Sequence, residues 1–282
     1  MKKILFVTIA VITGFFVSNA QVKMPAASPT ATISQEFGLG KIEITYSRPS
    51  LKGRTVFGEK STLAPLNEMW RVGANAATKI VFTEPVIIGG KRIDSGSYVI
   101  YVIPRNNEWE IIFNKGLKNW GVDGYKESED VVRIKAPTWI PAKPLETFSI
   151  SIQDITNETC NLQMSWGYVS AKFEIRTEIM GKLRSQFETA LSAEKVNTAV
   201  YQSAANFYFD MDKNYPKALE NIKKAIENNQ KGFWLYLLQG KIYKALGDNA
   251  NAKLSAEQCK KLAMEAKNAD YVRNADDLLK TL

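Results

Sequence analysis

From about Ala31 to Arg176, apolar and polar residues mostly alternate, which is the period of β-strands. Ala31–Phe37 and Lys41–Ser47 flank a glycine-containing turn and predict a hairpin. Further strands are expected at Thr78–Phe82, Val86–Ile88, Lys91–Ile93, Ser97–Ile103, Trp109–Asn114, Val131–Ile134, Leu145–Ile155, Thr159–Trp166 and Val169–Arg176. Many short strands separated by turns predict an antiparallel β-sandwich or jelly-roll-like domain over residues 27–178.

Three prolines, Pro137, Pro141 and Pro144, follow the strand that is expected at Val131–Ile134. Proline has no amide hydrogen to donate to a neighbouring strand, so it is confined to sheet edges and bends. We therefore expect this stretch to cross from one sheet to the other.

Beyond about Thr177, the apolar residues recur with the 3.6-residue period of a helix. Ile179, Leu183 and Phe187 would lie on one side of such a helix. Residues 179–196 are therefore expected to form a helix that links the β domain to the rest of the chain.

The C-terminal third of the chain repeats itself at a spacing of about 34 residues, which is the period of tetratricopeptide repeats. Phe209 corresponds in this way to Tyr243, and Ala218 corresponds to Ala252. Tetratricopeptide repeats are helix-turn-helix units that bury their apolar faces by stacking. Residues 197–282 are expected to hold two such repeats and a capping helix, so the fold class is α+β with separate β and α domains.

Stacked repeats of this kind usually present a groove to a protein partner and rarely catalyse reactions. The groove-facing positions on the first helix of each repeat are expected to be Ser203, Phe207, Leu237 and Lys241. Their mixed apolar and basic character suits an extended or helical peptide. Alternatively, the aromatic residues of this region fill contacts between helices or pack onto the β domain.

The first twenty residues have the features of a secretory signal peptide. Two lysines precede an apolar run over Ile4–Val17, and small residues follow it. We expect cleavage near Ala20-Gln21 and a mature protein that is periplasmic or secreted. No later segment approaches the roughly 18 apolar residues of a membrane-spanning helix, so no transmembrane segment is expected in the mature chain.

The chain of 282 residues carries a formal charge of +8, which falls to about +6 when the signal is removed. This excess suits an anionic glycan or envelope component as a partner, although it also serves solubility. The basic residues form no concentrated stripe, so no nucleic acid partner is expected. The chain has no histidine, which excludes histidine-based catalysis and most transition-metal sites. We expect neither a metal nor another cofactor.

Two cysteines, Cys160 and Cys259, are compatible with one disulfide in an oxidising compartment. However, Cys160 alternates in phase with Leu162 and Met164 on one strand face. Cys259 takes a small-residue core position in the second repeat. This pattern favours two separate buried thiols.

The first candidate site in the β domain is a cationic loop. Arg48, Lys52 and Arg54 lie within seven residues, among proline, glycine and serine. Such a loop can surround an anion with basic side chains and backbone donors. The alternative is a solvated connection that lies over the β domain and is anchored by its apolar residues.

The second candidate site combines an aromatic residue with polar ones. Trp70 and Arg71 could build a sugar-stacking or cation–π site in which Asn75 orients a polar group. Alternatively, Trp70 plugs the core and Arg71 pairs with an acidic residue.

Several motifs of the β domain occur together: Arg48-Pro49-Ser50 with Gly53-Arg54, Trp70–Asn75 with Thr78, Ser95–Tyr98, Trp109 with Asn114, and Trp120-Gly121. In this combination the chain resembles an uncharacterised family of secreted bacterial β-rich domains of unknown function, often followed by helical repeats. The resemblance covers roughly residues 27–178. It implies export and an all-β domain, but no established activity and therefore no catalytic residues.

We expect an exported, non-enzymatic binding or scaffolding protein. Its β domain would bind a ligand or an envelope component, and its repeats would dock a protein or peptide. The alternative is a glycan-active or glycan-binding protein that uses the segments Arg48–Arg54 and Trp70–Asn75. A glycosidase needs two carboxylates at a fixed separation, and the linear spacing singles out no pair among Glu84, Asp94, Glu110, Asp123 and Asp130.

Overall fold

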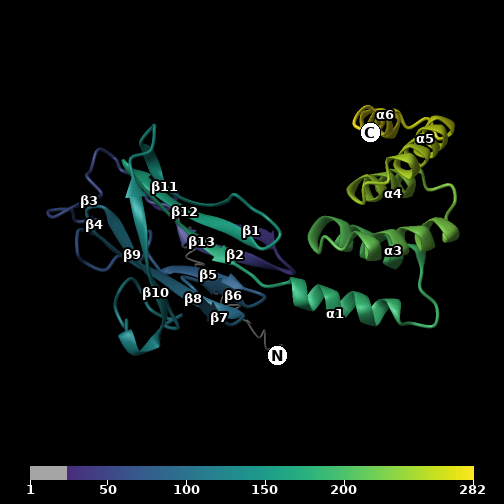
Figure 1. Cartoon of the computed structure of the whole chain (residues 1–282). Coiled ribbons are helices and arrows are strands. Elements are labelled where there is room, and N and C mark those ends of the chain that lie inside the picture. Colours follow the sequence, from purple (N-terminus) through teal and green to yellow (C-terminus); the bar gives the residue numbers. More distant parts are fainter. Residues whose placement is uncertain (1–23) are drawn as a thin grey trace, which may run out of the picture.

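The computed structural model describes residues 24–282, so the expected export signal lies outside the described residues. An antiparallel β domain is followed by a region of six α-helices, and the two parts lie beside each other (Figure 1). The expectation of separate β and α parts is confirmed. No helix in residues 24–282 is long and apolar enough to cross a membrane.

The strands lie close to where the alternation of apolar and polar residues predicts them. They are β1 (Thr30–Phe37), β2 (Gly40–Ser47), β3 (Phe57–Gly58), β4 (Ala64–Pro65), β5 (Thr78–Phe82), β6 (Val86–Ile88), β7 (Lys91–Ile93), β8 (Gly96–Pro104), β9 (Glu108–Asn114), β10 (Asp130–Trp139), β11 (Leu145–Gln153), β12 (Thr159–Gly167) and β13 (Val169–Arg176). Two differences stand out. The short strands β3 and β4 were not expected, and β10 is longer than expected.

Eleven strands form one continuous sheet that curves into a nearly closed barrel, with the main order β1-β2-β5-β8-β9-β10-β13-β12-β11. This corrects the expectation of two separate sheets. The strand β10 pairs with β9 as far as Pro137 and with β13 at Thr138 and Trp139. The change of partner therefore occurs inside one strand, at the proline that the sequence places there.

The segment that follows β2 closes the barrel against β11. The backbone nitrogen of Leu51 donates to the carbonyl oxygen of Glu146 at 2.8 Å, and that of Phe148 donates to the carbonyl oxygen of Pro49 at 2.9 Å. Closure satisfies backbone groups that would otherwise form an unpaired sheet edge.

Aromatic side chains fill the interior at this closure. The rings of Trp70 and Trp166 stack with their centroids 5.9 Å apart, and Phe57 packs on both Trp70 and Trp109. Trp109 is fully buried, and its indole nitrogen has no hydrogen-bond partner among the described residues. These large rings account for much of the apolar area that stabilises the barrel.

The helical region consists of α1 (Met180–Leu191), α2 (Thr198–Asn206), α3 (Tyr215–Asn228), α4 (Phe233–Ala245), α5 (Asn249–Glu265) and α6 (Ala269–Lys280). A π-helical turn, Phe207–Met211, extends α2. Asn214 and Asp248 lie one repeat period apart and cap α3 and α5 in the same way, since each side chain accepts a hydrogen bond from the backbone nitrogen three positions later.

Two contacts anchor α1 to the barrel. The ammonium group of Lys182 lies 2.9 Å from the carboxylate of Glu84, and the backbone nitrogen of Ile179 donates to the side chain of Glu158 at 3.0 Å. The helical region therefore begins at a fixed point on the barrel.

The two cysteines are in different parts of the fold. Cys160 is buried in the barrel on β12, and Cys259 is buried on α5. Both are free. The prediction of two separate buried thiols is confirmed, and the two cysteines form no disulfide with each other.

Candidate functional site

The arginines of the cationic loop hold the closing segment of the barrel in place. The Nε atom of Arg48 donates to the carbonyl oxygen of Phe148 at 3.1 Å. Arg54 donates to the carbonyl oxygens of Leu51 and Ser50, both at 2.9 Å. These bonds use one donor atom of Arg48 and two of Arg54 within the chain, as expected if the loop is a connection that lies over the β domain.

The second candidate segment forms a turn that is tied to the barrel wall. Trp70 is buried, and its indole nitrogen donates to the carbonyl oxygen of Gly73 at 3.2 Å. Arg71 donates to the carbonyl oxygen of Asn75 at 3.0 Å, and the amide of Asn75 donates to the hydroxyl of Ser47 at 3.3 Å. Trp70 is thus a core plug, while Arg71 stabilises the turn.

The glycan hypothesis requires four of these polar side chains to surround one cleft. Instead, they are hydrogen-bonded to nearby backbone and side-chain groups of two different segments. Lys52 is the sixth candidate residue. Its side chain is exposed, and its backbone nitrogen donates to the carboxylate of Glu146 at 2.9 Å. This geometry does not favour the glycan hypothesis.

A cluster of polar side chains on β9, β10 and the preceding loop centres on Arg133. Its guanidinium donates to Glu110 at 3.0 Å, to Asp130 at 2.8 Å and to the hydroxyl of Tyr125 at 2.6 Å. The hydroxyl of Tyr125 donates to Asp130 at 2.8 Å, and Arg105 donates to the second oxygen of Glu110 at 3.0 Å. Every charged group of this cluster has an opposite partner.

The pKa values of this cluster follow from its bonds. Burial would raise the pKa of Glu110, but hydrogen bonds from Arg105 and Arg133 outweigh it and hold that pKa below its usual range. Burial and the bond to the Asp130 carboxylate raise the pKa of Tyr125 to about 12. The cluster is a satisfied network that ties a loop to the barrel. In residues 24–282, no group of three His, Cys, Asp or Glu residues is placed to hold a metal ion.

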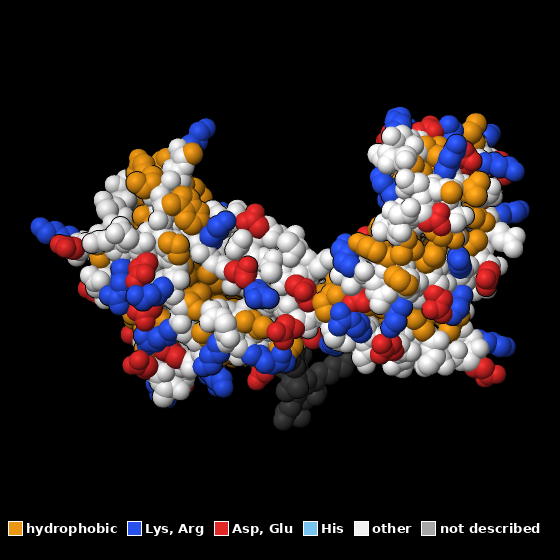
Figure 2. Space-filling view, viewed as in Figure 1, with side chains coloured by type: hydrophobic (Ala, Val, Ile, Leu, Met, Phe, Trp, Pro, Cys, Tyr) orange, Lys and Arg blue, Asp and Glu red, His pale blue; other side chains and the backbone are white. Residues whose placement is uncertain are grey.

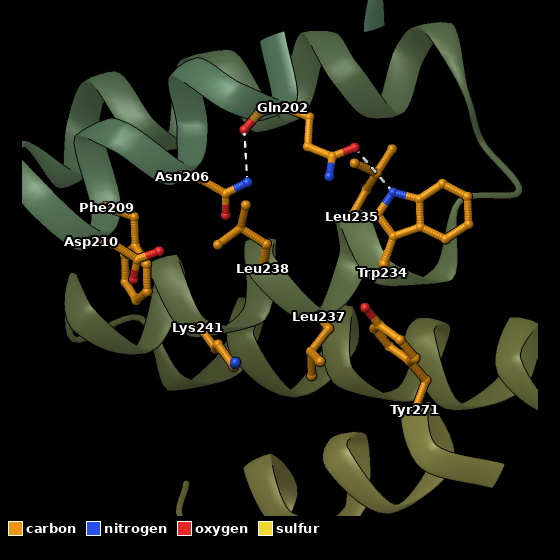
Figure 3. Close-up of a pocket in the computed structure, with 10 residues that line it drawn as sticks. All are labelled: Gln202, Asn206, Phe209, Asp210, Trp234, Leu235, Leu237, Leu238, Lys241 and Tyr271. Carbon is orange, nitrogen blue, oxygen red and sulfur yellow. Dashed lines mark hydrogen bonds between the residues drawn. The ribbon is translucent and has the colours of Figure 1, made fainter. Parts of the chain in front are cut away.

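The helical region carries a hollow of about 300 Å³, which we call the helical groove (Figure 3). It lies between α2, its π-helical turn, α4 and α6. Its lining residues are Gln202, Asn206, Phe209, Asp210, Trp234, Leu235, Leu237, Leu238, Lys241 and Tyr271. The hollow therefore combines leucine and aromatic side chains with amides and two charged groups.

The structure brings two of the four expected groove residues together. Leu237 and Lys241 both line the helical groove, whereas Ser203 is exposed on α2 and is not part of the lining. Phe207 needs a correction. It is buried against α1, where its ring stacks on Phe187 with the centroids 5.0 Å apart.

Phe207 lies outside the groove because of its phase on the helix. Gln202, Asn206, Phe209 and Asp210 line the groove at spacings of three and four residues, which is the period of one face of a helix. Ser203 lies one position after Gln202, and Phe207 lies one position after Asn206, so both are out of phase with the lining residues. The expected groove positions on the first repeat were therefore one residue too late.

Sequence reasoning also missed the other eight residues that line the groove, which come from several helices. The indole nitrogen of Trp234 donates to the side-chain oxygen of Gln202 at 3.1 Å, and this bond joins α4 to α2. Tyr271 on α6 lies one repeat period after Leu237, which itself lies one period after Ser203. Extending the repeat register into the last helix would have found Tyr271.

Several polar groups of the helical groove are not used within the chain. Asp210 and Lys241 are exposed, and neither forms an ion pair with another described residue. The amide nitrogen of Asn206 donates to the carbonyl oxygen of Gln202 at 3.1 Å, which leaves its side-chain oxygen facing the hollow (Figure 3). The groove can thus offer a hydrogen-bond acceptor and both signs of charge to a ligand.

Comparison with known protein families identifies the β domain. Residues 28–175 match the family described as "Protein of unknown function (DUF2911)". This range covers nearly the whole barrel and more than half of the chain. No curated protein matches the chain.

Proposed function

The chain belongs to the DUF2911 family of proteins of unknown function, and we propose that it is an exported binding or scaffolding protein rather than an enzyme. Its helical region docks a protein partner, and its barrel carries this region and contacts an envelope component. The observation that carries the proposal is the helical groove, where apolar side chains and unused polar groups lie together.

We propose that the helices are tetratricopeptide-like repeats. Three observations support this. Helix α2 packs against α3 and α4 against α5, equivalent caps lie one repeat period apart, and α6 packs against both α5 and α4 as a third repeat would. In such stacks the first helix of each unit lines the concave surface.

The occupant that fits this groove is an extended protein segment with an apolar side chain next to an acidic one. Leu237, Leu238 and Tyr271 provide an apolar surface for the first. The ammonium group of Lys241 provides a partner for the second. Amide side chains such as Asn206 can pair with the backbone of an extended segment, whereas a helix would use its backbone groups internally.

Selection from a display library of random dodecapeptides on the mature protein tests this proposal. Asp210 and Lys241 are exposed, so Asp210→Arg and Lys241→Glu should leave the fold intact. We expect the wild type to enrich peptides with an apolar and an acidic residue. Lys241→Glu should weaken their binding about tenfold or more, because it turns an attraction into a repulsion.

Lys253→Glu is the matched control, since Lys253 is exposed on the helix α5 and does not line the groove. It should bind the selected peptides as the wild type does. If no peptide is enriched, or if both lysine variants bind equally, the helical groove is not the docking site.

A further inference from the structure

The end of the barrel where β12 turns into β13 exposes large apolar side chains. The exposed fractions are 38% for Trp139, 78% for Ile140 and 65% for Tyr168. Trp139 on β10 pairs with Ser170 on β13. Tyr168 lies in the turn between β12 and β13, two residues before Ser170. Trp139, Ile140 and Tyr168 therefore lie at the same end of the barrel. Figure 2 shows a hydrophobic patch over this end, around β11 and β12.

We call this surface the barrel tip and define it by Leu51, Trp139, Ile140, Tyr168 and Val169. A hollow of about 380 Å³ opens beside it. The hollow is lined by the apolar side chains of Leu51, Val56, Phe57, Trp166, Tyr168 and Val169. An apolar group that enters the hollow would reach the aromatic interior of the barrel.

Basic side chains surround the barrel tip. Lys52 and Arg54 follow the closing segment, and Lys143 lies in the connection between β10 and β11; all three are exposed. None of them forms an ion pair with a described residue. Glu146 on β11 is the acidic residue beside them, and one of its carboxylate oxygens accepts a hydrogen bond from the backbone nitrogen of Lys52. The tip therefore has a net positive charge around an apolar centre.

We propose that the barrel tip docks on an anionic lipid surface. Tryptophan and tyrosine favour the boundary between headgroups and acyl chains, because their rings are apolar and carry one polar atom. Ile140 inserts among the acyl chains. Lys52, Arg54 and Lys143 lie at the level of the headgroups, where each cation near an anionic surface adds to the binding.

The shape and composition of the barrel tip favour a lipid surface over other occupants. The connection between β10 and β11 projects from the end of the barrel (Figure 1), so it can enter a soft surface. Ile140 is the most exposed residue of the tip, and its aliphatic side chain offers neither a stacking face to a sugar nor a hydrogen bond to a peptide. Strands on both sides hold Trp139 and Tyr168, so docking orders little additional chain.

Cosedimentation of the mature protein with vesicles tests the proposal. We expect binding to vesicles of phosphatidylcholine with phosphatidylglycerol, little binding to phosphatidylcholine alone, and weaker binding at high salt. Ile140→Asp should lower the binding more than about tenfold, since it removes the apolar side chain that inserts among the acyl chains and adds a negative charge. Lys143→Glu should lower it in the anionic vesicles alone.

Two exposed apolar residues elsewhere provide matched controls. Leu254 on α5 is 63% exposed, and Trp120 is 64% exposed in the loop before the start of β10, at the opposite end of that strand from Trp139. Leu254→Asp and Trp120→Ala should bind the vesicles as the wild type does. Absence of binding to the anionic vesicles, or an equal loss in Leu254→Asp and Ile140→Asp, would overturn the proposal.

The barrel tip and the helical groove are tested separately. The groove variant Lys241→Glu should bind vesicles normally, and Ile140→Asp should bind the selected peptides normally. If Ile140→Asp instead abolishes self-association of a protein that does not bind vesicles, the tip contacts a second copy and the lipid proposal is wrong.

Discussion

The hydroxyl group of Tyr46 on β2 contacts both backbone polar groups of Ile150 on β11, although the two residues lie 104 positions apart. It accepts a hydrogen bond from the Ile150 nitrogen at 3.1 Å and donates to the Ile150 oxygen at 3.5 Å. Both residues are buried. Where β2 and β11 do not pair as neighbouring strands, the side chain of Tyr46 thus takes the place of backbone hydrogen bonds between them.

Tyr46→Phe should lower the free energy of unfolding by about 1–3 kcal/mol, because it leaves a buried N–H group and a buried carbonyl without a partner. Urea denaturation measures this change. Tyr168→Phe is the matched control, since the Tyr168 side chain is 65% exposed, and it should leave the stability unchanged. Equal stability of all three proteins would mean that water replaces the hydroxyl.

Gly73 lies where the backbone comes too close for a side chain. A Cβ atom on Gly73 would lie 2.6 Å from the carbonyl oxygen of Ser47, and its φ is 134°. Gly53 has a φ of 74°, but a Cβ there would meet nothing within 4 Å. Gly53→Ala should therefore cost only the backbone strain, roughly 1–2 kcal/mol. Gly73→Ala should cost roughly 1–3 kcal/mol more, and thermal unfolding of the two variants compares them.

Tyr125 should make the barrel sensitive to alkaline pH. Its pKa is raised to about 12 in the folded protein by burial and by the Asp130 carboxylate, against about 10 in an unfolded chain. The stabilisation is therefore complete below pH 10 and is lost as the pH rises toward 12. Between pH 10 and pH 12, the free energy of unfolding of Tyr125→Phe should fall less than that of the wild type. Parallel curves of unfolding free energy against pH would contradict the assignment.

Both cysteines should be unreactive in the native protein. Burial raises the pKa of Cys160 to about 12 and that of Cys259 to about 11, so little thiolate forms near neutral pH. We expect a thiol reagent at pH 8 to modify neither residue in the folded chain and both in denaturant. The mobility of the denatured protein should not change with reducing agent. If fewer than two thiols react after the protein is unfolded, the prediction is wrong.

The expected export signal predicts a defined mature terminus. When the full chain is expressed in a bacterium that recognises the signal, mass spectrometry of the periplasmic or secreted protein should find Gln21 as the first residue. Ala20→Arg should block cleavage, because the cleavage site requires small residues. An uncleaved protein in the cytoplasm would show that the first twenty residues have another role.

The local pattern of residues was sufficient to predict most of the secondary structure. Alternation over Thr78–Phe82 and Val169–Arg176 gave the bounds of β5 and β13, because a strand with one buried face must alternate. Gly38 and the pair Gly89-Gly90 placed two hairpin turns, since their positive φ values favour glycine. These features depend only on neighbouring residues.

The candidate sites were predicted less well, because their roles depend on distant segments. Arg48 and Arg54 lie in a loop with the composition of an anion-binding site, but some of their donors bond to backbone carbonyls of the segments that close the barrel. Leu237 and Lys241 line the helical groove, whereas Phe207 is one position out of phase with the lining residue Asn206 and lies in the core.

By itself, the sequence determined the antiparallel β domain, the helical region after it and the separate thiols, because periodicity and turn residues are local properties. The tertiary structure decided that the strands form one barrel, that Tyr46 meets Ile150, and that Trp139, Ile140 and Tyr168 share one end. These relationships join residues from distant parts of the chain, and their pairing follows from packing that no single segment contains.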